Sequence, residues 1–593
     1  MASEIELCTS GGRGGRIVEV KEPLVLVASD AAGYMTGQTP SGDGGWTPGR
    51  VTSGATQEES RMDHIEELVD GLREPTAYPW KPDRVELIET HLSWVFLAGP
   101  YVVKVKRPVL YDFVDHLTSD ARHRSCCDEV RLNRRLTTDV YLSIVPITHQ
   151  GDGYSVDGNG PVVEWATVMR RLPADRMLDA LLACGLAPND LADRLAERLI
   201  PFHRDAAPPC DRATVGSAAA MTAVVTDNLN ELVEVGAGSA SRQQLALVTT
   251  AMRALVEENL APLEQRVVDG WIREGHGDLR AEHVCLEQNG AVQIFDCVEF
   301  SQAIRCADVA SDLAFLLMDL ERLAAADVAA QLEERYREAG FDLPHEHMRL
   351  YRAHRALVRA KVACLTLPSA NGEDRIELRR GIADYLNLAT RAAVTAKAFV
   401  IVMTGLSGTG KSTIAEALSR ATGASLVATD KVRKELAGSD APAPSTWQSG
   451  RYTQTRTERT YDAVFERAWE VVLAGRPVIL DGSFLAPARR ERAAELARAQ
   501  SAPLVIVETV CDEEVALERI SARAAKGTSR SDATADIYRR QRDELVSSPP
   551  PVPSDAVLVQ VNTSSDAPAD LGPTLTALRA AGALVLGIGP LRN

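Results

Sequence analysis

Short apolar runs and helical periodicity follow one another in the first two thirds of the chain. Runs typical of strands occupy Arg84–Glu89, Trp94–Leu97, Tyr101–Lys106 and Val162–Met169, and a helical pattern occupies Ala121–Leu136. Apolar residues at helical spacing then prevail to about residue 396, as in Leu178–Cys184, Leu191–His203, Arg242–Val256 and Leu313–Leu323. This order predicts a small β-rich lobe followed by a larger α-helical lobe, together a two-lobed α+β domain.

Beyond residue 398 the pattern becomes a regular alternation of strand and helix. Apolar runs lie at Phe399–Met403, Leu426–Ala428, Val478–Leu480, Leu504–Thr509 and Val557–Val561, and helical patterns lie at Ala463–Leu473, Ala488–Ala499 and Glu513–Ala525. Alternating strands and helices are typical of an α/β domain with a parallel sheet. We therefore expect two domains, residues 62–397 and residues 398–593.

Residues 1–61 are rich in glycine, serine and threonine and differ from the rest of the chain. Within them, Glu22–Gly49 resembles the C-terminal end of short-chain dehydrogenases, with its T-G-x-x-x-x-x-D-G-G turn. The glycine-rich turn that holds the pyrophosphate of a nicotinamide cofactor in that fold is absent upstream. We expect a non-catalytic extension, either a remnant of that fold or a low-complexity tail with a chance match, and Met62 as the native start.

Composition narrows the classes of partner. The 593 residues carry a formal net charge of −17, which disfavours duplex DNA or an anionic membrane surface, because both call for a basic face. The ten cysteines form no C-x-x-C pair, and there is no basic leader and no run of about 18 apolar residues. We expect a reduced, cytoplasmic protein. Only ten of the 65 basic residues are lysines, so a well-placed lysine is informative.

The strongest motif fits G-x-x-x-x-G-K-[ST] between an apolar strand and an amphipathic helix. Such a loop turns its backbone N–H groups and a helix N-terminus toward phosphate. Lys411 should reach the β- and γ-phosphates of ATP, and Ser412 should coordinate Mg²⁺. The predicted nucleotide-binding residues are Gly405, Ser407, Gly408, Thr409, Gly410, Lys411, Ser412 and Thr413.

Two aspartates follow neighbouring apolar strands of the same domain. Asp481 ends the run Val478–Leu480 and is either a metal ligand or a strand-end turn residue. Asp430 follows Leu426–Ala428, at the edge where strands of a parallel sheet present ligands. It could accept a proton from an attacking hydroxyl, with Arg433 suited to a polar acceptor, or it could only cap a helix.

Arg519, Arg523 and Arg530 fall in a predicted helix–loop–helix segment that is typical of a mobile lid. Lid arginines stabilise charge on a transferring phosphoryl group, whereas in this arginine-rich chain they could also be surface residues. Together with GLSGTGKST, ATDKVRKEL and VILDGSF, the segment resembles P-loop kinases grouped with zeta toxins, gluconate kinases and polynucleotide kinase. That resemblance implies phosphoryl transfer from ATP to a hydroxyl.

In the first domain, Asn289-Gly290 between two alternating runs is a strong hairpin signal. A two-residue turn pairs residue 286 with residue 293 and places His283 opposite Asp296, about 5 Å apart at Cα. Asp278 lies one short loop away. The hairpin therefore predicts a cluster of metal ligands and a base.

The segment His276-Gly-Asp-Leu followed by a hairpin that ends in Asp296 resembles the catalytic segment of aminoglycoside phosphotransferases. The resemblance implies that Asp278 orients the acceptor hydroxyl and that Asp296 holds Mg²⁺. His283 replaces the usual asparagine, and could either ligate metal or hydrogen-bond Asp296. Glu299 could add a carboxylate. Downstream, Asp308 and Asp312 match aspartates that brace the loop.

Lys104 and Lys106 alternate on one predicted strand, and Glu129 lies on the helix that follows. A strand lysine held by a helix glutamate directs a cation to the α- and β-phosphates, whereas the alternative is a solvated polar face. We select Lys104 first and Lys106 second.

The sequence therefore predicts two ATP- and Mg²⁺-dependent kinase domains that act on small-molecule hydroxyls, with no nucleic-acid or membrane partner. The combination resembles a family of tandem proteins with this domain order. Two alternatives stay open: a nucleotide-binding sensor whose first domain is inactive, and a toxin-like kinase of nucleotide sugars.

Overall fold

A computed structural model of the chain describes residues 66–111, 114–151, 153–209, 215–437, 454–525, 534–547, 549–565 and 570–586. The predicted N-terminal extension and Arg530 lie outside these ranges. Two compact units divide the described chain. We call residues 66–228 and 261–344 the N-terminal unit, and residues 229–260 and 345–586 the C-terminal unit.

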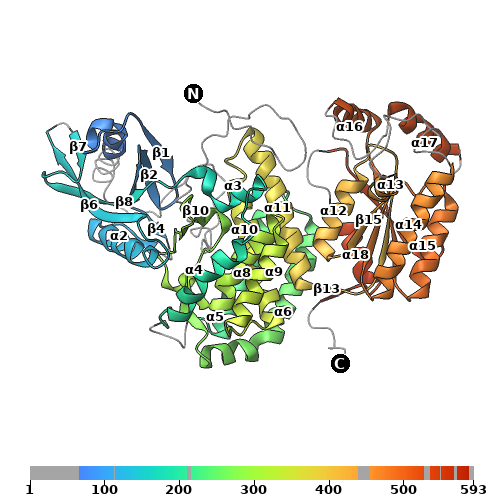
Figure 1. Cartoon of the computed structure of the whole chain (residues 1–593), viewed down its shortest axis with the longest axis horizontal. Helices are drawn as coiled ribbons and strands as arrows, with labels where there is room; N and C mark the ends of the chain where they lie inside the picture. Colours follow the sequence, from blue (N-terminus) through green and yellow to red (C-terminus); the bar gives the residue numbers. More distant parts are fainter. Residues whose placement is uncertain are drawn as a thin grey trace, which may run out of the picture. The chain divides into compact units, whose positions relative to one another are not determined.

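A six-stranded antiparallel sheet forms the first lobe of the N-terminal unit (Figure 1). Its strands, in spatial order, are β1 (Val85–Glu89), β2 (Ser93–Ala98), β3 (Tyr101–Lys106), β8 (Val162–Arg170), β6 (Tyr141–Gln150) and β7 (Gly153–Val156). Helix α2 (Ser119–Asn133) packs on β6 and β8, and the Thr118 hydroxyl caps it by accepting the Ala121 N–H at 3.2 Å. This packing brings side chains of α2 over β3.

The second lobe of the N-terminal unit is mainly helical. Its helices are α3 (Leu178–Ala183), α4 (Leu191–Asp205), α7 (Gln302–Arg305), α8 (Val309–Arg322) and α9 (Ala326–Glu338), and its strand pairs are β10 (Val284–Leu286) with β11 (Val292–Ile294) and β9 (Ile272–Glu274) with β12 (Cys306–Asp308). Helices α5 (Ala218–Val235) and α6 (Arg242–Val268) contribute residues to both units. The predicted two-lobed α+β fold is confirmed.

The predicted hairpin register is wrong by one residue. The observed pairs are Val284 with Ile294 and Leu286 with Val292. The residue opposite His283 is therefore Phe295 and not Asp296. A three-residue loop replaces the expected two-residue turn, because Glu287 pairs with Ala291. Gly290 has φ +88°, the left-handed conformation that such loops require.

A five-stranded parallel sheet forms the core of the C-terminal unit, as predicted. Its order is β15 (Ser425–Ala428), β16 (Val478–Asp481), β14 (Val400–Thr404), β17 (Leu504–Val510) and β18 (Ala556–Asn562). Helices α12 (Lys411–Thr422), α13 (Thr429–Ala437), α14 (Gln454–Leu473), α15 (Pro487–Ala499), α16 (Glu513–Ala525), α17 (Ala535–Ser547) and α18 (Gly572–Ala580) accompany it.

Two long helices that precede the parallel sheet in the chain belong to the same unit. They are α10 (His345–Thr366) and α11 (Gly372–Ala393), and α11 packs against α12. Strand β13 (Val394–Ala396) continues from α11 and pairs with β19 (Leu584–Leu586). The domain boundary at residues 397 and 398 stays a prediction.

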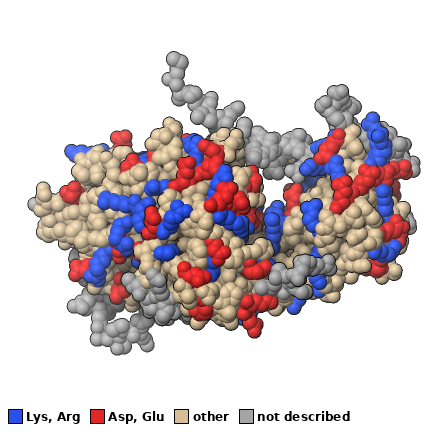
Figure 2. Space-filling view, turned by 60° about the horizontal axis from the view of Figure 1, so that its bottom comes forward, with Lys and Arg blue, Asp and Glu red and all other residues tan. Residues whose placement is uncertain are grey.

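One face of the molecule shows charges of both signs. On the face shown in Figure 2, acidic and basic side chains are interspersed over both units. Within the described part of the chain, no helix is both long and apolar enough to cross a membrane.

Candidate active sites

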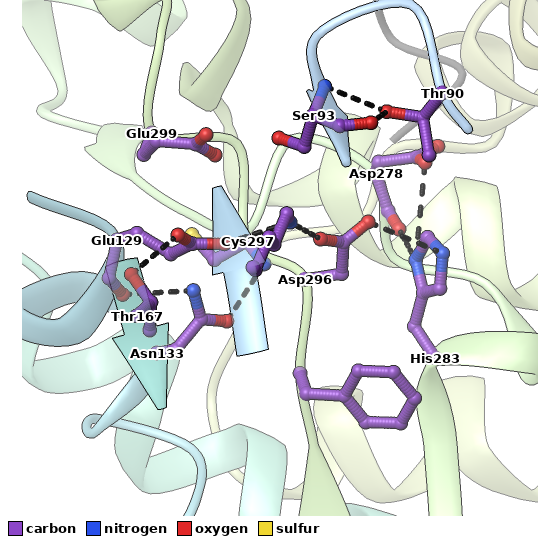
Figure 3. Close-up of polar contacts among 12 residues, drawn as sticks. Thr90, Ser93, Glu129, Asn133, Thr167, Asp278, His283, Asp296, Cys297 and Glu299 are labelled. Atoms are coloured by element: carbon purple, nitrogen blue, oxygen red, sulfur yellow. Dashed lines mark hydrogen bonds and ion pairs between the residues drawn. The ribbon is translucent and has the colours of Figure 1, made fainter. Parts of the chain in front are cut away.

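The buried carboxylate of Glu129 contacts both predicted strand lysines of the N-terminal unit. Figure 3 shows this glutamate beside Thr167. The Lys104 ammonium lies 2.7 Å from Oε1 of Glu129, and the Lys106 ammonium lies 3.0 Å from Oε2. The Thr167 hydroxyl of β8 donates to the same Oε2 at 3.1 Å. Lys104 is 3% exposed and the other two charged residues are fully buried, so the lysines do not form a solvated polar face.

The same lysine reaches the aspartate that follows the hairpin. Nζ of Lys104 donates to Oδ1 of Asp296 at 3.1 Å. Asp296 has φ +63°, a left-handed conformation that is costly outside glycine and is common at functional sites. Its other oxygen, Oδ2, is buried and accepts no hydrogen bond. A buried anionic oxygen of this kind is suited to a cation, so the residues present fit a magnesium ion here.

Mutual attraction keeps this network ionised. Burial lowers the pKa of Lys104, but Asp296 and Glu129 outweigh it and raise that pKa well above its usual value. Burial raises the pKa of Glu129, but Lys104 and Lys106 outweigh it and hold that pKa at about 2. Lys106 also contacts Glu299, whose pKa is raised by burial. Lys104, Lys106 and Glu129 therefore carry fixed charges at neutral pH.

Replacing Glu129 by glutamine is expected to lower the free energy of unfolding of the N-terminal unit by about 3–5 kcal/mol, because two buried lysines lose their shared partner. The folded pKa lies below the ordinary one, so the stabilisation is full above about pH 4.5 and is lost as the pH falls toward 2. Thermal unfolding of the unmodified protein and of Glu129→Gln, measured between about pH 2 and pH 7, tests the effect. The control is Glu86→Gln, which removes an exposed ion pair with Arg84. An equal loss in both variants would contradict the assignment.

The loop that carries Asp278 is held from behind by α8. Asp312 accepts the backbone N–H groups of His276 at 2.7 Å and Gly277 at 2.9 Å, and its Oδ2 also binds His203 at 3.0 Å. Gly277 has φ +87°, and a Cβ there would lie 3.1 Å from the Cα of Arg305. This loop geometry therefore requires glycine between His276 and Asp278.

His276 is a structural member of this loop. Its Nε2–H donates to the Phe295 carbonyl at 2.9 Å, and its Nδ1 accepts the Asp278 N–H at 3.3 Å. Burial lowers its pKa to about 4, so the ring is neutral at physiological pH. The ring thereby links the Asp278 loop to the end of the hairpin.

The carboxylate of Asp278 is bound by an arginine that the sequence analysis missed. Nε and Nη2 of Arg280 donate to Oδ1 and Oδ2 of Asp278 at 3.0 and 2.9 Å. The guanidinium also contacts Glu282, and Arg280 is 2% exposed. The available signal was a basic residue two positions after the aspartate in a motif that otherwise offers no cation.

His283 lies between the two candidate catalytic aspartates. Its Nδ1–H donates to the Asp278 carbonyl at 2.8 Å, since a carbonyl oxygen can only accept. Nε2 lies 3.3 Å from Nη2 of Arg280 and 3.7 Å from Oδ2 of Asp296. The direct hydrogen bond to Asp296 is therefore not formed. Among the described residues, no group of three or more His, Cys, Asp or Glu is arranged to hold a metal alone.

The phosphate loop of the C-terminal unit joins β14 to α12. Gly405 has φ +131°, and a Cβ there would lie 2.5 Å from the Thr509 carbonyl, so the loop needs glycine. Oε1 of Gln541, on α17, accepts the N–H and the hydroxyl of Ser407 at 3.0 and 2.9 Å. The Lys411 ammonium donates to the Leu406 carbonyl at 2.7 Å. Gly408, Thr409, Gly410 and Thr413 complete the loop and the first turn of α12.

Ser412 and Asp481 meet beside this loop. The serine hydroxyl donates to Oδ2 of Asp481 at 2.7 Å, and burial raises the pKa of that carboxyl. Asp481 is the last residue of β16 and is 6% exposed, so it is not a turn residue on the surface. Burial lowers the pKa of Lys411 to about 8, with Asp481 and Asp430 opposing the shift. The predicted cation and both carboxylates therefore share one site.

The remaining predicted groups surround the loop. Asp430 lies in the first turn of α13, where Arg433 donates to it at 2.5 Å. Arg519, on α16, donates to the Thr563 carbonyl at 2.7 Å, and Arg523 interacts electrostatically with Lys411. The sequence analysis missed Gln541 and Thr563, because polar residues of α17 and of the segment after β18 carry no motif.

Comparison with known proteins gives long matches to mycobacterial proteins. The Mycobacterium tuberculosis protein named "Uncharacterized protein Rv2004c" is 32% identical over 456 residues, which cover 76% of this chain and 88% of that protein. A family model described as an AAA domain matches residues 400–547.

Two solved structures are similar over parts of the chain. A gluconokinase from Sinorhizobium meliloti 1021 has 22% identity and a TM-score of 0.23, and the match covers 31% of this chain and 94% of that one. A choline/ethanolamine kinase family protein from Mesorhizobium loti has 16% identity and a TM-score of 0.32, and the match covers 54% and 94%.

Proposed function

The chain belongs to the family of the mycobacterial protein Rv2004c, and we propose that it is an ATP-dependent phosphotransferase with two kinase sites. Each site transfers the γ-phosphoryl group of ATP to a hydroxyl of a small molecule. The observation that carries this proposal is the Lys104 ammonium, held 2.7 Å from Glu129 and 3.1 Å from Asp296. Kinases use this arrangement to place a cation on the α- and β-phosphates beside a metal-binding aspartate.

In the N-terminal unit, Asp278 accepts the proton of the acceptor hydroxyl as its oxygen attacks the γ-phosphorus. The new bond joins that oxygen to phosphorus, and the bond from phosphorus to the bridging oxygen breaks, so that ADP leaves. Lys104 binds the departing phosphates, and Asp296 would hold Mg²⁺. A bound Mg²⁺ would neutralise phosphate charge.

In the C-terminal unit, the loop N–H groups and Lys411 bind the phosphates, and Ser412 with Asp481 would hold Mg²⁺. Asp430 accepts the proton of the second acceptor. Arg519 and Arg523 stabilise charge on the transferring group, and the same role is proposed for Arg530.

Incubation of the full chain with γ-labelled ATP, Mg²⁺ and a panel of sugars and amino alcohols tests the proposal. Label is expected to appear in at least one phosphorylated small molecule. Label found only in inorganic phosphate, or only in unreacted ATP, would contradict it.

A second candidate is a nucleotide sensor in which the N-terminal unit does not turn over. It is favoured by the Arg280 guanidinium, which occupies both oxygens of the Asp278 carboxylate. For such a sensor, Mg·ATP would raise the unfolding temperature of the Lys411→Ala protein while that protein formed no phosphorylated product.

A further inference from the structure

A line of polar groups crosses the site of the N-terminal unit. It runs from the Asp278 carboxylate to Nη2 of Arg280 at 2.9 Å, to Nε2 of His283 at 3.3 Å, and to Oδ2 of Asp296 at 3.7 Å. Oδ1 of Asp296 continues it to Lys104 at 3.1 Å. The guanidinium therefore contacts the proposed base directly and approaches the proposed metal-binding aspartate through the ring of His283.

Protein kinases bind a second metal ion, which is held by the metal-binding aspartate and by an asparagine of the catalytic loop. Here His283 takes the position of that asparagine. Its Nδ1–H is committed to the Asp278 carbonyl, and its Nε2 faces a guanidinium that can donate to it. The side chain in the position of the second-metal ligand, His283, therefore already faces the guanidinium of Arg280.

Charge counting agrees with this arrangement. The site has three buried basic side chains, those of Lys104, Lys106 and Arg280. They stand against four buried carboxylates, those of Glu129, Asp278, Asp296 and Glu299. Without Arg280 the site would have one cation fewer to set against these carboxylates and the ATP phosphates.

We propose that Arg280 takes the place of the second metal ion, so that the N-terminal unit works with one divalent ion and one fixed guanidinium. This inference rests on the proposed function. During transfer the guanidinium stabilises negative charge on the γ-phosphoryl oxygens while Asp278 receives the acceptor proton. An arginine is suited to this task because its guanidinium stays charged while it holds a carboxylate in a bidentate contact.

The direct test counts metal ions. Mn²⁺ binding is measured by electron paramagnetic resonance on the full chain carrying Lys411→Ala, with a non-hydrolysable ATP analogue. The same chain with Asp296→Asn supplies the background to subtract. We expect one Mn²⁺ per chain with Arg280 present, and two in Arg280→Met, because the change removes the guanidinium that faces Nε2 of His283 and the Asp278 carboxylate. Two ions with Arg280 present, or one ion in both proteins, would overturn the proposal.

Turnover in the same background gives a second readout. Arg280→Met is expected to lower kcat by at least about 100-fold, with little change in the affinity for the nucleotide analogue. Arg280→Lys keeps a cation and is expected to bind one Mn²⁺ and to retain part of the activity. A rise in kcat in Arg280→Met would show that Arg280 inhibits the reaction by binding the Asp278 carboxylate, and would overturn the proposal. If no variant transfers phosphate, the proposed function fails, whereas the metal count still decides the role of Arg280.

Discussion

Asp278→Asn is expected to abolish phosphoryl transfer by the N-terminal unit. Asparagine keeps the size of the side chain but cannot accept the proton of the acceptor hydroxyl, and general-base catalysis is worth about 100- to 10,000-fold. We expect kcat to fall by that factor in the Lys411→Ala background. Nucleotide affinity should stay within about twofold, because Lys104, Glu129 and Asp296 are untouched.

The control for this variant is Asp327→Asn, which changes an exposed aspartate on α9 of the same unit. The two proteins are compared by initial rates with labelled ATP and by analogue binding. Activity that survives in Asp278→Asn would remove this aspartate from the chemistry. Loss of nucleotide binding together with activity would instead indicate a folding role, since Arg280 loses its carboxylate partner in the same change.

Lys411→Ala has the corresponding effect on the C-terminal unit. The half-buried ammonium donates to the Leu406 carbonyl of the phosphate loop and lies in the field of Asp481 and Asp430, so its removal leaves the site without its central cation. We expect the rate of this unit to fall by about 100- to 1,000-fold, measured in an Asp278→Asn background. Lys397→Ala, an exposed lysine of the same unit, is the control. Unchanged turnover in Lys411→Ala would exclude the P-loop from the reaction.

Local patterns predicted much of the fold. Alternation along β3 placed Lys104 and Lys106 on one face, and strand–helix alternation predicted the parallel sheet. The hairpin register was wrong because Asn289-Gly290 is compatible with loops of two and three residues. Strands β6 and β7 were missed, and helices α10 and α11 fold with the P-loop sheet although they precede it in sequence. These features depend on contacts between distant segments.

In the candidate sites, too, local motifs predicted some residues, whereas others were recognised only from contacts in the structure. Motif spacing was sufficient to name Asp278, Asp296, Lys411 and Asp481, because each follows a strand or a glycine-rich turn. Arg280 was not recognised, since a basic residue two positions after the aspartate is a weak signal in an arginine-rich chain. Its burial and its two bonds to Asp278 identify it in the structure. The tertiary structure therefore adds the partners of the motif residues and not the motif residues themselves.

The most direct measurement incubates a small-molecule cell extract with γ-labelled ATP and four forms of the full chain: unmodified, Asp278→Asn, Lys411→Ala, and the double variant. We expect each single variant to lose a different set of labelled phosphorylated products and the double variant to lose both sets. Products that persist at full yield in the double variant would contradict the assignment of two kinase sites to this chain.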